Sequence, residues 1–189
     1  MRLPGFAMTN EQYARSTIED WIEAVQEEVA TLKASHGRVH LVAHSLGAAI
    51  SLACETQEPG TFDSMSLVAP LISVSNARSP ILSTQQWRWV GRSLLVFTHS
   101  TFNPFPPDIK DPNAENYPWC VPATPRSVIA QTLQLADQIR PLADELTVPV
   151  LMVASRQDLV VDFEASKRFF EAISTEKRWV EATQSGHLV

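Results

Sequence analysis

The stretch that decides the fold runs from residue 39 to residue 47 and reads VHLVAHSLG. Its first five residues form a short apolar run rich in β-branched side chains, which favours a strand buried on both faces of a parallel sheet. Small, helix-compatible residues follow from Leu46 to Glu55, and Pro59-Gly60 stops them. The pattern therefore predicts a strand, a tight turn at Ser45 and a helix in immediate succession.

The turn carries a G-x-S-x-G pattern in which Ala43 takes the first glycine position and Gly47 the second. Residues two before and two after the serine must be small, because strand and helix approach closely there. Such a turn raises the Ser45 hydroxyl above the C-terminal edge of the sheet. It also aims the Leu46 N–H, at the helix N-terminus, toward a developing oxyanion. A serine that only caps a helix would also give S-x-G, but correctly ordered partners downstream favour a nucleophile.

A carboxylate and a histidine follow in the order that such a nucleophile requires. Asp158 comes directly after an apolar strand, which places it at the same sheet edge as the serine. Asp162 is the alternative acid, although it is better explained as the N-cap of the next helix. His187 lies in the loop after the next strand, and Gly186 gives the backbone freedom to turn the imidazole. We therefore predict a triad of Ser45 as nucleophile, Asp158 as acid and His187 as base.

The other histidines receive lesser roles. His44, beside the serine, cannot place its ring on the hydroxyl in the needed geometry, so we expect it to pack near the site. His40 lies within the strand and is expected to be a satisfied interior or interface residue. The candidate substrate contacts are His44, His99, Trp87 and Phe102.

Strands alternate with helices along the chain, which predicts an α/β fold with a mostly parallel sheet and flanking helices. The expected strands are 39–43, 65–69, 148–154 and 178–182, and the expected helices are 17–34, 46–55, 127–139 and 163–173, after a loop at 1–10. A segment rich in proline and aromatic residues shows no clear element order, and a loop this long is usually functional. We interpret 1–70 as the first part of the core, 71–126 as a cap insertion and 127–189 as the second part of the core.

The chain has 189 residues, of which 44% are hydrophobic and 19% charged, and a formal net charge of −6. This composition is typical of a folded domain and lacks the basic surface of a nucleic-acid-binding protein. Cys54 and Cys120 lack CxxC spacing, and we expect both to be reduced, as in an intracellular enzyme. The sequence shows no metal-ligand cluster or phosphate-binding glycine loop, so no cofactor is expected. With no membrane-length apolar run and no visible signal peptide, we expect a cytoplasmic protein with peripheral membrane contact.

With these residues in place, the chain resembles α/β-hydrolases of the monoacylglycerol lipase and lysophospholipase branch, which are grouped with serine aminopeptidase-like hydrolases. The resemblance rests on LPGF at 3–6, LVAHSLGAAI at 41–50, MSLVAPLI at 65–72, VLMVASRQDLVV at 150–161 and SGHLV at 185–189. The segment FTHS at 97–100 is most similar to the cap of bacterial lysophospholipases. The resemblance implies an α/β-hydrolase fold and a serine esterase that cleaves acyl-lipid esters through an acyl-enzyme.

The chain departs from the family pattern in three respects. Ala43 and Ala7 stand where glycines are usual, and no aspartate precedes Leu3. The family has about four strands before this point and a last helix after the histidine, so we expect these elements to be missing. The missing strands include the loop that donates the second oxyanion N–H, and His36-Gly37 lies at the wrong sheet edge to replace it. Without those strands the nucleophile strand becomes an exposed apolar edge, which predicts self-association.

These observations leave three functional hypotheses. The first is hydrolysis of lysophospholipid or monoacylglycerol esters, with peptidase, thioesterase and small-ester activity as further options. The second is a catalytically impaired hydrolase fragment that acts as a binding or interaction module, since losing one oxyanion donor costs about a hundred- to a thousand-fold in turnover. The third is a normal enzyme whose first strands are absent from this chain.

Overall fold

The computed structural model describes residues 1–77, 100–102, 108–110 and 123–188. In chain order its elements are α1 (Asn10–Arg15), α2 (Ile18–His36), β1 (His40–His44), α3 (Leu46–Gln57), β2 (Ser64–Val68), β3 (Ser100–Phe102), β4 (Ala123–Pro125), α5 (Arg126–Ile139), the 3₁₀ helix η1 (Arg140–Glu145), β5 (Val150–Ala154), α6 (Phe163–Ala172) and β6 (Lys177–Glu181). Among these residues no helix is both long and apolar enough to cross a bilayer.

The predicted alternation of strands and helices is confirmed, since every expected element overlaps an observed one. The short helix α1 is an addition to the expected set, and it begins at a capping box between Thr9 and Gln12. The expected cap insertion, 71–126, lies largely outside the described residues. Within it, β3 and β4 pair antiparallel, and β4 leads directly into α5.

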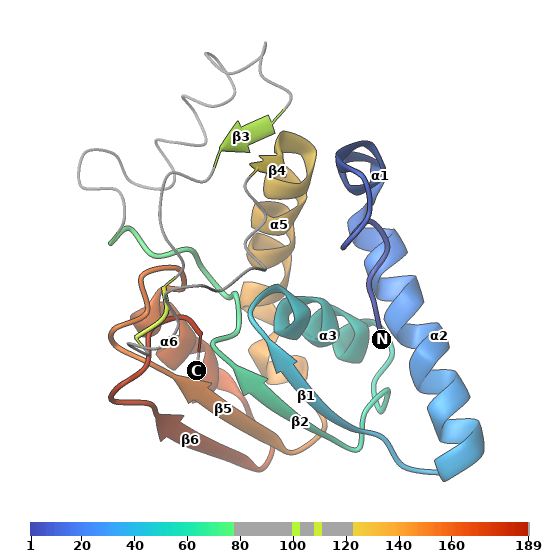
Figure 1. Cartoon of the computed structure of the whole chain (residues 1–189). Helices are drawn as coiled ribbons and strands as arrows, with labels where there is room; N and C mark the ends of the chain where they lie inside the picture. Colours follow the sequence, from blue (N-terminus) through green and yellow to red (C-terminus); the bar gives the residue numbers. More distant parts are fainter. Residues whose placement is uncertain (78–99, 103–107, 111–122, 189) are drawn as a thin grey trace.

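Four parallel strands form the main sheet in the order β1-β2-β5-β6. Each crossover steps in the same direction across the sheet, and crossovers between parallel strands are right-handed. The helices in those crossovers, α3, α5 and α6, therefore lie on one side of the sheet, where α3 contacts β1 and α6 contacts β5 (Figure 1). Because all four strands run the same way, the loops after β1, β5 and β6 converge at one edge.

The helix α2 completes the layer beside α3. It begins at a capping box between Thr17 and Asp20 and ends at Gly37, where the φ of 79° favours glycine. It buries Trp21 completely, and the indole N–H donates to the Pro4 carbonyl at 3.1 Å. This contact ties the N-terminal loop to the helix layer, next to α3.

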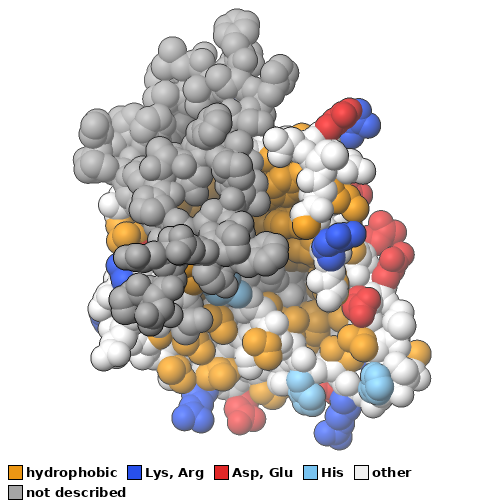
Figure 2. Space-filling model, viewed as in Figure 1, with side chains coloured by type: hydrophobic (Ala, Val, Ile, Leu, Met, Phe, Trp, Pro, Cys, Tyr) orange, Lys and Arg blue, Asp and Glu red, His pale blue; other side chains and the backbone are white. Residues whose placement is uncertain are grey.

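The opposite face of the sheet carries apolar side chains that are partly exposed. Met65, Leu67 and Met152, which face the helices, are fully buried, whereas Val42 on β1 is 77% exposed and Val180 on β6 is 38% exposed. Figure 2 shows hydrophobic side chains gathered over the sheet on this face. Parallel sheets are normally covered on both faces, so the described part of the chain leaves apolar surface open here.

A buried carboxylate closes the end of α3. Glu55 is 1% exposed, and its two oxygens accept hydrogen bonds from the amides of Gly60 at 2.8 Å and Phe62 at 3.0 Å. The hydroxyl of Thr147 donates to the same carboxylate at 3.2 Å. Glu55 therefore fixes the turn between α3 and β2 against the segment that precedes β5.

We expect Glu55→Ala to lower the free energy of unfolding by about 3 kcal/mol, because it leaves buried amide donors without an acceptor. Urea unfolding followed by circular dichroism measures the change. Glu58→Ala, which removes an exposed carboxylate three residues away, is the matched control and should change stability by less than about 0.5 kcal/mol. Equal effects of the two substitutions would contradict the role given to Glu55.

Candidate active site

Ser45 lies on the turn between β1 and α3 and has an unusual backbone conformation. Its φ is 52° and its ψ is −119°, a region that residues other than glycine rarely adopt. The Ser45 amide donates to the Val68 carbonyl at 3.0 Å, and its carbonyl accepts from the amides of Ala49 and Leu71, each at 3.2 Å. Such strain costs about 1–3 kcal/mol and persists only where the surroundings hold it. Here the end of β2 and the first turn of α3 supply that support.

Asp158 lies in the loop after β5, and both of its carboxylate oxygens have partners. Oδ1 accepts from the amides of Val160 at 2.7 Å and Val161 at 2.8 Å, which leaves Oδ2 to face the histidine. Asp162, the alternative acid, caps α6 by accepting from the Ala165 amide at 2.7 Å, as predicted. The two carboxylates therefore have different roles: Asp158 faces the histidine, and Asp162 caps α6.

His187 joins the other two side chains. Its Nδ1 lies 2.9 Å from Asp158 Oδ2, and its Nε2 lies 2.8 Å from Ser45 Oγ. Since the carboxylate can only accept, Nδ1 carries the proton of the neutral ring and Nε2 accepts from the serine hydroxyl. The three residues that the sequence singled out are thus brought into one continuous hydrogen-bonded chain, although His187 is 142 residues from Ser45.

His44 supports the histidine from the other side. Its Nε2 lies 2.8 Å from the His187 carbonyl, so it is the donor in this hydrogen bond. The two imidazole rings lie 4.8 Å apart, centre to centre. His44 packs beside the ring of His187, and among the described residues it forms no hydrogen bond to the serine hydroxyl or to the acid.

Two pKa values in this cluster depart from their ordinary positions. Burial alone would raise the pKa of Asp158, but the hydrogen bonds from His187, Val161 and Val160 and attraction to the imidazolium outweigh it and hold that pKa below 3.8. Burial is the main cause that lowers the pKa of His44 below 6.5, against the opposing hydrogen bond to the His187 carbonyl. The site therefore favours an ionised acid and a neutral His44 at neutral pH.

Several further candidates can be placed and others cannot. Leu46 is the first residue of α3, so its N–H lacks an intrahelical acceptor and lies beside the serine. His40, expected to be a satisfied interior or interface residue, is exposed on β1, so the interior alternative is wrong, and its Nδ1 lies 2.8 Å from Ser64 Oγ. Trp87 and His99 lie outside the described residues. Phe102 belongs to β3, and its side chain is likewise outside what the structure describes.

The structure does not support the explanations expected for glycine at positions 47 and 186. A Cβ at Gly47 would meet no described atom within 4 Å, so the close approach expected there is not seen among these residues. Gly186 does not adopt a positive φ, so backbone freedom is not its reason. A Cβ at Gly186 would instead lie 2.6 Å from the carbonyl oxygen of Asp108. Glycine is needed at 186 because another segment passes against it.

Two polar residues that the sequence did not single out bind the loops of the site. Ser155 Oγ donates to the Ser185 carbonyl at 2.5 Å and accepts from the Gln157 amide at 3.1 Å, so it links the loops after β5 and β6. Asp108 accepts from the amides of Leu159 and His187. Both contacts join residues far apart in the chain, and no local pattern signals them.

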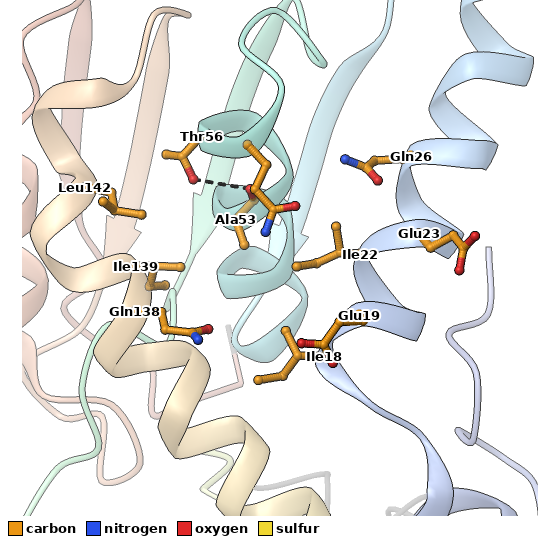
Figure 3. Close-up of a pocket in the computed structure, with 11 residues that line it drawn as sticks. Ile18, Glu19, Ile22, Glu23, Gln26, Ala53, Thr56, Gln138, Ile139 and Leu142 are labelled. Carbon is orange, nitrogen blue, oxygen red and sulfur yellow. Dashed lines mark hydrogen bonds between the residues drawn. The ribbon is translucent and has the colours of Figure 1, made fainter.

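A groove of about 450 Å³ opens between α2, α3 and the α5–η1 segment (Figure 3). It is lined by Glu19, Glu23 and Gln26 from α2 and Thr56 from α3, and also by the apolar Ile22 and Ile139. None of the triad residues lines it. Within the described ranges no group of three or more His, Cys, Asp or Glu side chains could hold a metal ion.

A serine on a strained strand-to-helix turn, with an aspartate and a histidine converging from the loops after later strands of a parallel sheet, defines the class of α/β-hydrolases. Residues 5–189 match the family model described as serine aminopeptidase, S33, and the chain belongs to this family. The predicted resemblance to α/β-hydrolases grouped with serine aminopeptidase-like enzymes is confirmed, and the similar proteins include a monoacylglycerol lipase.

Similar proteins cover nearly all of the chain. A thermostable monoacylglycerol lipase from Bacillus sp. strain H-257 is 25% identical over 188 residues, which are 99% of this chain and 70% of that enzyme. Among solved structures, one from a study of LipS and LipT, two metagenome-derived lipolytic enzymes, superposes with a TM-score of 0.82 at 20% identity, covering 98% of this chain and 71% of the other. A soluble variant of the monoglyceride lipase from Saccharomyces cerevisiae gives 0.76 at 15% identity, with coverage of 97% and 67%.

We expect acid to destabilise the protein partly through His44. Because the folded state lowers the pKa of His44, the neutral form stabilises the fold above pH 6.5, and this contribution is lost as pH falls from 6.5 through the lower folded value. The variant His44→Gln keeps an N–H donor for the His187 carbonyl and cannot titrate. Urea unfolding between pH 5 and pH 8 should therefore show a smaller loss of stability toward acid in His44→Gln than in the parent. Parallel curves for the two proteins would contradict this.

Proposed function

We propose that this protein is a serine hydrolase that cleaves carboxylic esters of acyl lipids through an acyl-enzyme. One observation carries the proposal: the unbroken hydrogen-bonded chain from Ser45 Oγ through the His187 ring to Asp158, at 2.8 and 2.9 Å. A histidine bonded to a helix-capping serine alone would not need a buried carboxylate behind it, with that carboxylate itself held by two amides.

In the proposed reaction His187 Nε2 takes the Ser45 proton while Oγ forms a bond to the ester carbonyl carbon. The electron pair of the carbonyl moves to its oxygen, near the Leu46 N–H at the start of α3. When the tetrahedral intermediate collapses, the bond to the alcohol oxygen breaks and His187 returns its proton to that oxygen. Water then repeats the sequence on the acyl-enzyme and releases the acid, while Asp158 stabilises the imidazolium throughout.

The substrate class is inferred from the relatives. The matched Bacillus protein is a monoacylglycerol lipase and the yeast structure is a monoglyceride lipase. These names support monoacylglycerol as the substrate of this chain, and lysophospholipid, which is also a single-chain acyl lipid, is the alternative. Such substrates form micelles or reside in bilayers, which is consistent with peripheral membrane contact by a cytoplasmic protein.

A fluorophosphonate probe tests the chemistry directly. We expect it to label the purified protein at Ser45, as located by mass spectrometry, and to leave Ser45→Ala unlabelled. Asp158→Asn should slow labelling by about a thousand-fold or more, because the imidazole loses its fixed tautomer. Asp162→Asn is the matched control and should label normally, since asparagine caps a helix as well as aspartate does. A folded protein that fails to label would favour the alternative, an impaired hydrolase fold that acts as a binding module.

The acyl chain and the leaving group are tested with two sets of esters. Rates for p-nitrophenyl esters from two to sixteen carbons should rise with acyl length until the chain fills its binding site. Comparing monoacylglycerol with lysophosphatidylcholine of the same acyl chain then separates the two lipid classes. A preference for the acetyl ester over all longer esters would contradict an acyl-lipid substrate.

We also infer self-association through β1. Among the residues that the structure describes, this strand is hydrogen-bonded on one side only, to β2, and Val42 at its centre is 77% exposed. An unpaired apolar edge is a template for another strand. We expect the molar mass from light scattering to rise with protein concentration and this rise to be weakened by Val42→Lys. Met8→Lys, at an exposed methionine outside the sheet, is the control. A constant monomer mass in the parent protein would overturn the inference.

A further inference from the structure

Asp108 is a buried carboxylate outside the triad, and it reaches both loops that supply the acid and the base. The residue is 6% exposed. Its Oδ2 accepts from the Leu159 amide at 2.7 Å and from the His187 amide at 2.9 Å. One oxygen atom therefore bridges the residue that follows Asp158 and the backbone of the proposed base itself.

The hydrogen bonds of the acid loop divide between two carboxylates. The amides of Val160 and Val161 point to Asp158, whereas the amide of Leu159 points to Asp108. Three consecutive N–H groups are thus used to hold two acids in fixed places. Asp158 orients its own carboxylate within the loop, and Asp108 ties that loop to the loop of the histidine.

The backbone around Asp108 reinforces the link. The Leu188 amide donates to the Asp108 carbonyl at 3.2 Å, and Ile109 forms an isolated parallel bridge with Leu188. Figure 1 shows this short segment beside the end of the chain. Gly186 has no side chain, and a Cβ there would lie 2.7 Å from Asp108 Oδ1. Both neighbours of His187 therefore pack against Asp108: Gly186 leaves room for its side chain, and Leu188 bonds to its carbonyl.

The charge of Asp108 has a partner on the solvent side. Lys110 Nζ lies 3.6 Å from Oδ1, and its side chain is 39% exposed, compared with 2% for the aspartate. A partly exposed ion pair of this length contributes little by itself. The hydrogen bonds to the two amides therefore contribute more to stability than the ion pair does. A buried amide left without an acceptor destabilises the fold by more than a screened ion pair stabilises it.

We propose that Asp108 is a positioning residue: it fixes the spacing and orientation of the Asp158–His187 pair by accepting hydrogen bonds from both loops at one oxygen. This inference rests on the proposed function, since it assigns the residue that aligns the acid and base of the same site. Asp108 touches no reacting atom and acts only through the backbone of His187 and Leu159.

Two variants separate the hydrogen-bond acceptor from the charge. Asp108→Asn keeps an oxygen that can accept from both amides, whereas Asp108→Leu keeps a similar volume and removes the acceptor. We expect Asp108→Leu to lower the second-order rate constant of fluorophosphonate labelling at Ser45 by about a hundred-fold, the effect of a displacement of about 1 Å in a catalytic group. Asp108→Asn should stay within about three-fold of the parent, as should Lys110→Ala, since the main effect lies in the amide contacts.

Glu55→Ala controls for general destabilisation, because it also removes a buried carboxylate that accepts from two amides, at the far end of α3. Labelling of folded Glu55→Ala should remain near the parent rate. Folded Asp108→Leu that labels at the parent rate would overturn the proposal, and so would an Asn variant as slow as the Leu variant. A loss confined to Asp108→Leu would support it.

Two measurements that do not depend on labelling keep the proposal separate from the proposed function. In the parent protein, hydrogen exchange of the Leu159 and His187 amides should be at least about a hundred-fold slower than in an unfolded chain. Unprotected amides would overturn the proposal even if Asp108→Leu fails to fold. The downfield proton signal of the His187 Nδ1–H should be present in the parent and in Asp108→Asn and lost in Asp108→Leu. A parent protein that does not label but shows these signals would refute the hydrolase function and leave the positioning role intact.

Discussion

The imidazole of His187 is the point on which the site depends, because every polar atom of this residue is bonded. Its ring nitrogens meet Ser45 and Asp158, its amide meets Asp108 and its carbonyl accepts from His44. Fixing the side chain of a histidine on a loop costs conformational entropy, and these hydrogen bonds offset that cost. Four partners from three separate segments, the end of β1, the segment at Asp108 and the loop after β5, hold the residue in a single arrangement, and the fold brings those segments together.

The sheet performs this task because its strands are parallel. The carboxyl ends of β1, β5 and β6 share one edge, so loops that are distant in sequence meet there. The same edge holds the strain at Ser45, whose amide and carbonyl are bonded to the end of β2 and to Leu71. Strain at one residue is therefore opposed by ordinary sheet and helix contacts around it, which is how a positive φ can persist at a serine.

The four strands of the main sheet, the helices α2, α3, α5 and α6, and the positions of the three hydrogen-bonded residues could be predicted from the sequence, because each leaves a local pattern. The apolar run before Ser45 and the small residues after it indicate strand and helix, and Asp158 and His187 follow later strands in order. The roles of Asp108 and Gly186 could not be predicted, since they arise from a contact between segments almost eighty residues apart. The sequence pattern suggests backbone freedom as the reason for Gly186, but the structure shows that glycine is needed there because a side chain would collide with Asp108.

The acid–base pair and the nucleophile turn depend on β1 to different degrees. Apart from the His44 hydrogen bond to the His187 carbonyl, which comes from the last residue of β1, the hydrogen bonds that hold the proposed acid and base come from segments after β2, β5 and β6. None of these bonds uses the backbone edge of β1. Ser45 and the Leu46 amide, in contrast, follow directly from that edge strand, whose outer side has no bonded partner among the described residues. A strand added at β1 would therefore leave the acid–base pair in place and act on the nucleophile turn and its oxyanion donor. For this reason the order of the Asp158–His187 pair and the efficiency of Ser45 are separable properties of this chain.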